Sequence, residues 1–298
     1  MGLPRFNYLA PKTIKEASAL LAEHGDKARL MAGGTDLLIR LRHRAMTPEY
    51  VISLRGVPGL DHVFFDRSAG LNIGALAKLA DVAGHPEIRK HYPALAESAS
   101  ATATVQIRNM GTLAGNICNA APSADNATPL LVYEAEVTIV HPGGERVVPM
   151  DEFFRGPGLT ALEKGEIVKE IIMPPPGPRT GSNYRKISAR SRVDIAAVGV
   201  AALMQLDEEG VVSKVRIGLG AVAPVPLLAH RAARILAGRK PSPELIEQAG
   251  DLAADEARPI NDVRATAAYR RRMVRVLTIR ALQASLDLAV SKMTGCES

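Results

Sequence analysis

Cysteine, tryptophan and long apolar runs are scarce or missing in this sequence of 298 residues. The two cysteines, Cys118 and Cys296, are too few for a disulfide framework or for a four-cysteine zinc or iron–sulfur site, so any metal cluster must lie on another chain. We therefore expect a reducing, cytoplasmic setting. No run of about 18 apolar residues occurs, and the first residues lack a basic segment followed by an apolar one, so we expect neither a membrane span nor a secretory signal of that kind.

Aromatic residues make up only 4% of the chain, but 47% of the residues are apolar and 23% are charged, which excludes disordered and fibrous proteins. The length predicts about two domains, each with enough residues to bury a core. With 37 basic and 31 acidic residues, the formal net charge is +6. This modest excess would suit an anionic partner but selects none.

The first part of the chain alternates helical and strand patterns and then changes to hairpins. Helical spacing covers residues 12–24 and starts again after Thr35 and Asp36, while residues 28–32 and 50–54 have the pattern of buried strands. We therefore predict two lobes that divide near residue 56. Beyond that point we expect hairpins at 62–74 and 136–148, helices at 75–83 and 88–103, and a strand at 165–173.

A proline-rich segment at 174–178 is the sharpest break in composition, because it can continue neither a helix nor a central strand. We place a domain boundary there, with one domain at 1–175 and a second at 176–298. The second domain is predicted to be a small antiparallel sheet with packed helices, which makes the fold class α+β. Its expected strands are 182–188, 195–206 and 211–219, and its expected helices are about 226–237, 243–257 and 265–290.

Two segments have residues suited to ligand binding. The first, residues 31–36, places a glycine pair between a strand and a helix, where backbone N–H groups can approach a phosphate closely. The second, residues 106–125, is rich in small and hydrogen-bonding residues and is longer than a simple connection between two helices. The alternatives are a tight strand-to-helix turn for the first segment and an ordered connecting loop for the second.

Together the two segments resemble the FAD-binding signatures of a known family. Residues 32–36 and 106–125 are similar to the two signatures of the molybdenum-hydroxylase flavoprotein subunit, the medium chain of carbon monoxide dehydrogenase, xanthine dehydrogenase and their relatives. Each string is short, but their order and spacing together are specific, and the resemblance extends over essentially the whole chain. Further strings that fit lie at 4–8, 71–75, 184–186, 194–196, 218–224, 269–271 and 280–282.

This resemblance implies a two-lobed FAD domain of the p-cresol-methylhydroxylase type, followed by the small sheet domain. It also implies that the two loops hold the FAD pyrophosphate, that Asp125 contacts the adenosine part and that Lys186 lies near the flavin ring. No catalytic residue and no metal ligand are expected. The implied cofactor-binding residues are Met31, Ala32, Gly33, Gly34, Thr35, Asp36, Thr112, Leu113, Ala114, Gly115, Asn116, Asp125 and Lys186.

The resemblance further implies electron transfer. Electrons would come from a molybdopterin centre on a large subunit, pass through two [2Fe-2S] clusters on a small subunit, reach FAD on this chain and leave to NAD, a quinone, oxygen or another carrier. The expected assembly is a dimer of heterotrimers. The alternatives are a freestanding FAD-dependent oxidase or dehydrogenase, and a non-catalytic nucleotide-binding or assembly protein.

Two alanines depart from the family pattern. Ala114 and Ala103 stand where relatives often have glycine, and the cost of each depends on whether its φ is negative or positive. Because neither change removes a hydrogen-bonding side chain, we interpret both as tolerable.

Three other patterns are interpreted as structural. Residues 218–223 match a dinucleotide fingerprint, but Pro224 and Pro226 stand where its helix should start, so a strand leaving the sheet is favoured. The arginine-rich helix near the end carries an apolar stripe, which indicates a packed helix with a solvated or subunit-facing arginine side. The seven histidines lack metal-site spacing. Surface positions are expected for Asp151, Glu152, Glu163, Glu166 and Glu170.

Overall fold

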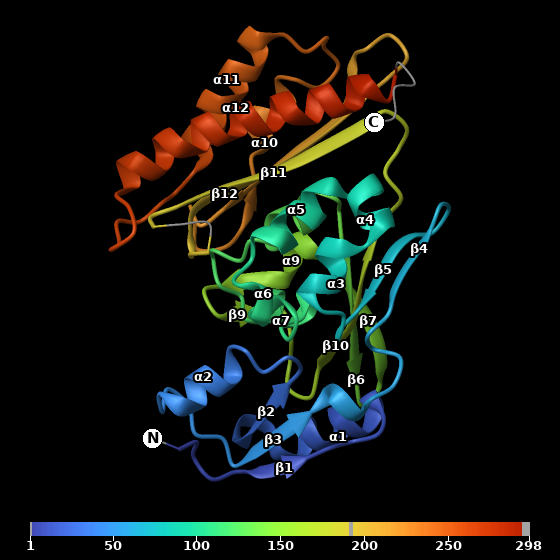
Figure 1. Ribbon diagram of the computed structural model, residues 1–298, viewed down its shortest axis with the longest axis vertical. Coiled ribbons are helices and arrows are strands. Elements are labelled where there is room, and N and C mark those ends of the chain that lie inside the picture. The colour runs from blue at the N-terminus through green and yellow to red at the C-terminus, as the bar shows by residue number, and fades with distance from the viewer. Residues whose placement is uncertain (1, 191–192, 294–298) are drawn as a thin grey trace.

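The computed structural model describes residues 2–190 and 193–293. Three larger β-sheets follow one another along its long axis, with the N-terminal lobe at one end and the longest helix, α12, at the other (Figure 1). The α+β prediction is confirmed. No helix in the described ranges combines the length and the apolar character needed to cross a bilayer.

The N-terminal lobe is a parallel three-stranded sheet with the order β1-β3-β2. Parallel neighbours need crossover connections, and the helices predicted from residue spacing supply them. The first of these helices is capped by Thr13, whose Oγ1 accepts a hydrogen bond from the backbone N–H of Glu16. The elements are β1 (Asn7–Leu9), α1 (Ile14–His24), η1 (Gly25–Lys27), β2 (Ala28–Met31), α2 (Leu37–Arg42), β3 (Tyr50–Ser53) and η2 (Leu54–Gly56).

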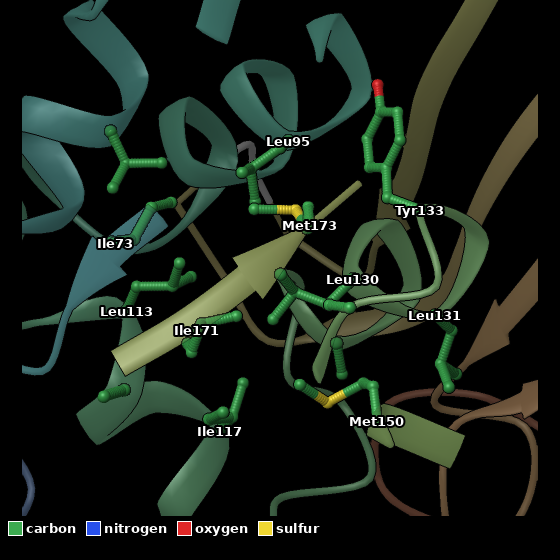
Figure 2. Packing of buried hydrophobic residues seen from close by; sticks show 14 of the residues in the cluster. Ile73, Leu95, Leu113, Ile117, Leu130, Leu131, Tyr133, Met150, Ile171 and Met173 are labelled. Atoms are coloured by element: carbon green, nitrogen blue, oxygen red, sulfur yellow. The ribbon is translucent and has the colours of Figure 1, made fainter. Parts of the chain in front are cut away.

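The middle of the molecule is an antiparallel five-stranded sheet with the order β4-β5-β10-β6-β7, packed against short helices. Its central strand carries much of the core: Figure 2 shows Ile171 and Met173 lying among Leu113, Ile117 and Leu130. The strands are β4 (Val63–Asp66), β5 (Gly70–Gly74), β6 (Glu136–His141), β7 (Gly144–Pro149) and β10 (Ile167–Met173), with a small hairpin of β8 (Phe154–Gly156) and β9 (Leu159–Thr160). The helices are α3 (Leu79–Gly84), α4 (Pro86–His91), α5 (Pro93–Ala101), α6 (Val105–Arg108), α7 (Leu113–Cys118), α8 (Ala127–Val132) and α9 (Met150–Phe153).

Three predictions for this region were wrong in detail. The helix expected at 88–103 is two helices, α4 and α5, because Pro93 disfavours helical geometry at Tyr92 and starts a new helix itself. The helix expected from residue 75 begins only at Leu79. The long loop expected at 106–125 contains most of α6 and all of α7.

The C-terminal part is an antiparallel sheet with the order β11-β12-β13-β14. Its three long strands were predicted, but the helix expected at about 226–237 is instead the short strand β14 followed by the short helix α10. Helix α12 packs on β11, β12 and α11, while α5 and α8 of the middle part pack on the same sheet. The elements are β11 (Thr180–Ser188), β12 (Ala196–Leu206), β13 (Val212–Gly220), β14 (Leu227–Leu228), α10 (His230–Arg234), α11 (Pro243–Glu256) and α12 (Ala267–Ser291).

Strand β12 is apolar on both sides because the sheet lies between two cores. Ala201 and Leu203 belong to the core of the middle part, whereas Val200 and Ala202 belong to the core under α12. Successive side chains of a strand point to opposite faces, so one strand joins the two cores. This contact holds the C-terminal sheet against the middle part, beside the candidate site.

The arginine-rich helix α12 differs from its predicted form at Arg270. This side chain is only 3% exposed and donates hydrogen bonds to the carbonyls of Ala197 and Ala221 and to Asp262, so it is neither solvated nor free to face another subunit. Arg271 and Arg272 are exposed, as expected. At the other discounted motif, β13 ends at Gly220 and the next described helix begins ten residues later, which confirms a strand leaving the sheet.

Candidate cofactor-binding site

A cleft of about 790 Å³ lies where four parts of the chain meet. They are the β2–α2 loop of the N-terminal lobe, the segment 102–125, the start of β10, and residues 190 and 193–195, which lie between β11 and β12. A volume in the range of about 300–1,000 Å³ suits a cofactor-sized ligand. In Figure 1 this region lies between α2 on one side and α6 and α7 on the other.

The structure brings together nearly all residues that the sequence placed at a binding site. Leu113 and Lys186 are the exceptions. Leu113 is fully buried in the core beneath the second loop, where it anchors α7 (Figure 2). The residues that line the cleft are Met31, Ala32, Gly33, Gly34, Thr35, Asp36, Thr112, Ala114, Gly115, Asn116 and Asp125.

The first loop offers a row of backbone hydrogen-bond donors. Within the described ranges, the amide N–H groups of residues 33–36 have no protein acceptor. Gly34 makes this path possible because its φ is +78°, a left-handed conformation that other residues adopt only with strain. Arg55 holds the opposite side of the loop by donating to the carbonyls of Ala32 and Gly33. Four free amides in one turn form a donor set for an anionic group.

The two loops touch each other at Gly33. A Cβ atom on this glycine would lie 2.1 Å from the carbonyl oxygen of Met110, so only glycine permits the contact. The second loop is fixed from the other side by a hydrogen bond from the N–H of Leu79 to the carbonyl of Gly111. Gly33 was expected to let a phosphate approach the backbone, but glycine is required here first because the two loops pack against each other at this residue.

Helix α7 presents the second loop to the cleft. Thr112 caps the helix, and its Oγ1 accepts a hydrogen bond from the N–H of Gly115 at 2.9 Å. Ala114 lies in the first turn and is absent from the residues with positive φ, so alanine in place of the family's glycine costs little there. Arg40 of α2 reaches across and donates to Asn119 Oδ1 at 2.5 Å. The two sides of the cleft are thereby joined.

Ala103 is the departure that carries strain. Its φ is +48°, and it lines the cleft in a turn that Arg108 clamps by donating to the carbonyls of Thr102 and Ala103. Ala103 therefore has the positive φ at which an alanine is costly, and the family's frequent glycine has a physical reason here. The same contact gives a role to Arg108, which belongs to the second binding segment, 106–125.

Ala103→Gly is expected to stabilise the chain by roughly 0.5–1 kcal/mol, because glycine adopts positive φ without the steric cost that alanine pays. Ala114→Gly is the matched control and should destabilise it by a similar amount, since its backbone is helical. Urea unfolding of both variants measures the two effects. Equal signs for the two changes would refute the backbone argument.

Asp125 and Lys186 form a buried ion pair between the middle part and β11. Their charged atoms are 2.8 Å apart and each side chain is 8% exposed. Tyr184 donates to the same carboxylate at 2.6 Å. Burial raises the pKa of Asp125, while Lys186 and Tyr184 oppose the rise. Lys186 is therefore engaged behind Asp125, and of the two only Asp125 lines the cleft.

Sequence reasoning missed Glu166 at the cleft wall. This carboxylate is 6% exposed, lines the cleft and accepts two hydrogen bonds of 2.6 Å from Arg146. Arg146 holds the pKa of Glu166 below its usual range. The expected surface position was wrong for Glu166 and also for Glu170, which is only 14% exposed beside His62. Only the sheet order brings Arg146 of β7 near the start of β10, and the sequence carries no signal for that order.

Cys118 lies in the cleft wall as a free thiol, and burial raises its pKa to about 12. Cys296 lies outside the described residues. Within the described ranges, no group of three or more histidine, cysteine or acidic side chains could hold a metal ion. The polar groups of the cleft are backbone donors, small side chains and paired charges, set among aliphatic side chains such as Leu37 and Ile39, a combination that suits a dinucleotide.

Comparison with known proteins identifies the family of this chain. The family described as "FAD binding domain in molybdopterin dehydrogenase" matches residues 4–176, and "CO dehydrogenase flavoprotein C-terminal domain" matches residues 183–285. The chain belongs to this flavoprotein family. It is an oxidoreductase subunit.

The relatives of this flavoprotein match over nearly their whole length. The carbon monoxide dehydrogenase medium chain of Hydrogenophaga pseudoflava is 36% identical over 95% of this chain and 97% of its own. The putative xanthine dehydrogenase FAD-binding subunit of Escherichia coli (strain K12) is 32% identical over 96% of this chain and 98% of its own. A solved structure of the Hydrogenophaga enzyme, which lacks the Mo-pyranopterin moiety of the molybdenum cofactor, superposes with a TM-score of 0.92, 36% identity, and coverage of 97% of this chain and 99% of that one.

Proposed function

We propose that this flavoprotein is the electron-transfer subunit of a heteromeric molybdenum hydroxylase. It receives electrons from [2Fe-2S] clusters on a small partner subunit and passes them through FAD to an external acceptor. A large partner subunit carries the molybdopterin cofactor, and two such three-subunit units form a dimer. The names of the relatives and their full-length match support this assignment.

The donor set of the cleft is the observation that carries the proposal. The amides of residues 33–36, which have no protein acceptor in the described ranges, line the same cleft as α7, so a diphosphate bound there would accept the hydrogen bonds that these amides otherwise do not make within the protein. Bound FAD can exchange electrons singly or as a hydride, which links iron–sulfur clusters to two-electron acceptors. The chain's own residues bind and orient this group, and we propose no catalytic residue among them.

We assign cofactor binding to the residues inferred from the two loops, with different roles. The first loop and Thr112 to Asn116 hold the diphosphate and its neighbouring groups. Leu113 supports them indirectly, by packing α7 on the core. Asp125 contacts the nucleotide directly, and Lys186 acts through Asp125, because Lys186 is already engaged by it. The division into domains at residue 175, the two lobes and a cytoplasmic location also remain part of this proposal.

Co-expression with the genes that flank it, followed by purification through a tag on this subunit, tests the proposed function. FAD, iron and molybdenum in the purified complex, seen by visible spectrum and metal analysis, are the expected result. FAD on this chain alone would favour a freestanding flavoenzyme. No flavin after reconstitution would overturn the proposal and favour a non-catalytic protein.

A further inference from the structure

We propose that Asn126, a buried residue outside the cleft, fixes the orientation of the Asn116 side-chain amide. In this orientation the NH₂ group of Asn116 is free to donate a hydrogen bond to the bound dinucleotide. Asn126 is then a positioning residue that acts through Asn116. The inference rests on the proposed FAD site and adds a residue that the binding signatures do not predict. It specifies the chemistry offered at Asn116: a hydrogen-bond donor, suited to a phosphate or carbonyl oxygen of the ligand.

Asn126 lies in a closed polar network. It is fully buried, and its Nδ2 donates to Thr102 Oγ1 at 3.1 Å and to Asn116 Oδ1 at 3.0 Å. Its Oδ1 accepts a hydrogen bond from Ser98 Oγ at 3.0 Å. Both amide hydrogens and the amide oxygen are thereby used. In the reversed orientation Nδ2 would face Ser98 Oγ, whose own hydrogen can go to the carbonyl of Leu95 at 3.0 Å, and the second amide hydrogen would have no partner in the network.

The direction of the network follows from the Thr102 hydroxyl, because its single hydrogen is already used. Thr102 Oγ1 donates its hydrogen to the backbone carbonyl of Ser98 at 2.8 Å. The Thr102 oxygen therefore needs a donor from Asn126, which places Nδ2 on that side. The same Nδ2 group meets Asn116, and the atom of Asn116 that faces it must be the oxygen.

This arrangement leaves Asn116 with an unused donor. Asn116 lines the cleft and is half-buried, and within the described ranges its Nδ2 donates to no protein acceptor. Asn126 itself is not among the residues that line the cleft. A reversed Asn116 amide would point its oxygen to the ligand and would leave two donors facing each other inside the network.

A double-mutant cycle tests whether Asn126 acts through Asn116. Asn126→Asp has nearly the same shape but replaces the donor with an acceptor, so Asn116 should turn its NH₂ inward. In the otherwise unchanged full chain we expect FAD to bind about 10-fold more weakly, the size of one lost hydrogen bond to a charged or strongly polar group. In an Asn116→Ala chain the same change should weaken FAD binding less than about 2-fold.

The measurements are the FAD dissociation constant by flavin fluorescence and the fraction folded by near-ultraviolet circular dichroism. Equal losses in both backgrounds, or no loss in the unchanged one, would overturn the role of Asn126. If Asn126→Asp does not fold, Thr102→Val replaces it in the same double-mutant cycle, because this change removes the acceptor that orients Asn126. Failure of the unchanged chain to bind FAD would instead refute the proposed function, so the two failures are distinguishable.

Discussion

Gly34→Val should reduce FAD affinity at least about 100-fold while the chain remains folded. A β-branched residue at φ +78° is strongly strained, so the loop must leave its left-handed turn. The amides of residues 33–36, which have no protein acceptor in the described ranges, are then displaced. Losing two hydrogen bonds to an anion, at about 1.5–3 kcal/mol each, corresponds to this fall in affinity. Titration of flavin-free protein with FAD, followed by fluorescence, measures it.

Gly210→Val is the matched control, because Gly210 has nearly the same φ, +76°, but lies in a hairpin turn with open space around it. It should cost stability and leave FAD affinity within about 2-fold. Gly33→Val is less informative: its side chain would collide with the backbone of Met110 and displace the second loop. If Gly34→Val binds FAD as tightly as the unchanged chain, the first loop is not part of the FAD site.

Much of the fold could be predicted because local patterns agree with the final structure. The three long C-terminal strands and the proline break are visible in hydrophobic periodicity and composition. The middle helices were less accurate, since the break between α4 and α5 depends on Pro93 within a continuous helical pattern. The strand order β4-β5-β10-β6-β7 depends on contacts between segments about a hundred residues apart, which periodicity does not encode.

The two binding loops could be predicted because their glycines and small residues are contiguous in the sequence. What could not be predicted is how distant residues support them. Glu166 meets Arg146 only through the sheet, and Asn126 gains its role only because Thr102 comes close to it in the folded chain. The strain at Ala103 is likewise a property of the folded turn.

Lys186→Met should destabilise the chain by about 3–5 kcal/mol at neutral pH, because it leaves the carboxylate of Asp125 buried without its cation. Burial already raises the pKa of Asp125 above 3.8, and removing Lys186 raises it further. The folded variant then holds a proton that the unfolded chain releases, so its stability falls as the pH rises above about 3.8 and recovers as the pH falls. Urea unfolding across this range measures the slope.

Lys214→Met is the control, because Lys214 forms an ion pair with Glu134 in which the two side chains are 41% and 39% exposed. Exposed pairs contribute at most about 1 kcal/mol, so this variant should lose little stability and show little added dependence on pH. Adding Asp125→Asn to Lys186→Met removes the buried charge and should restore most of the lost stability, as expected when both members of a buried pair are replaced. If the double variant is as unstable as Lys186→Met alone, the loss comes from packing of the lysine stem and not from the unpaired carboxylate.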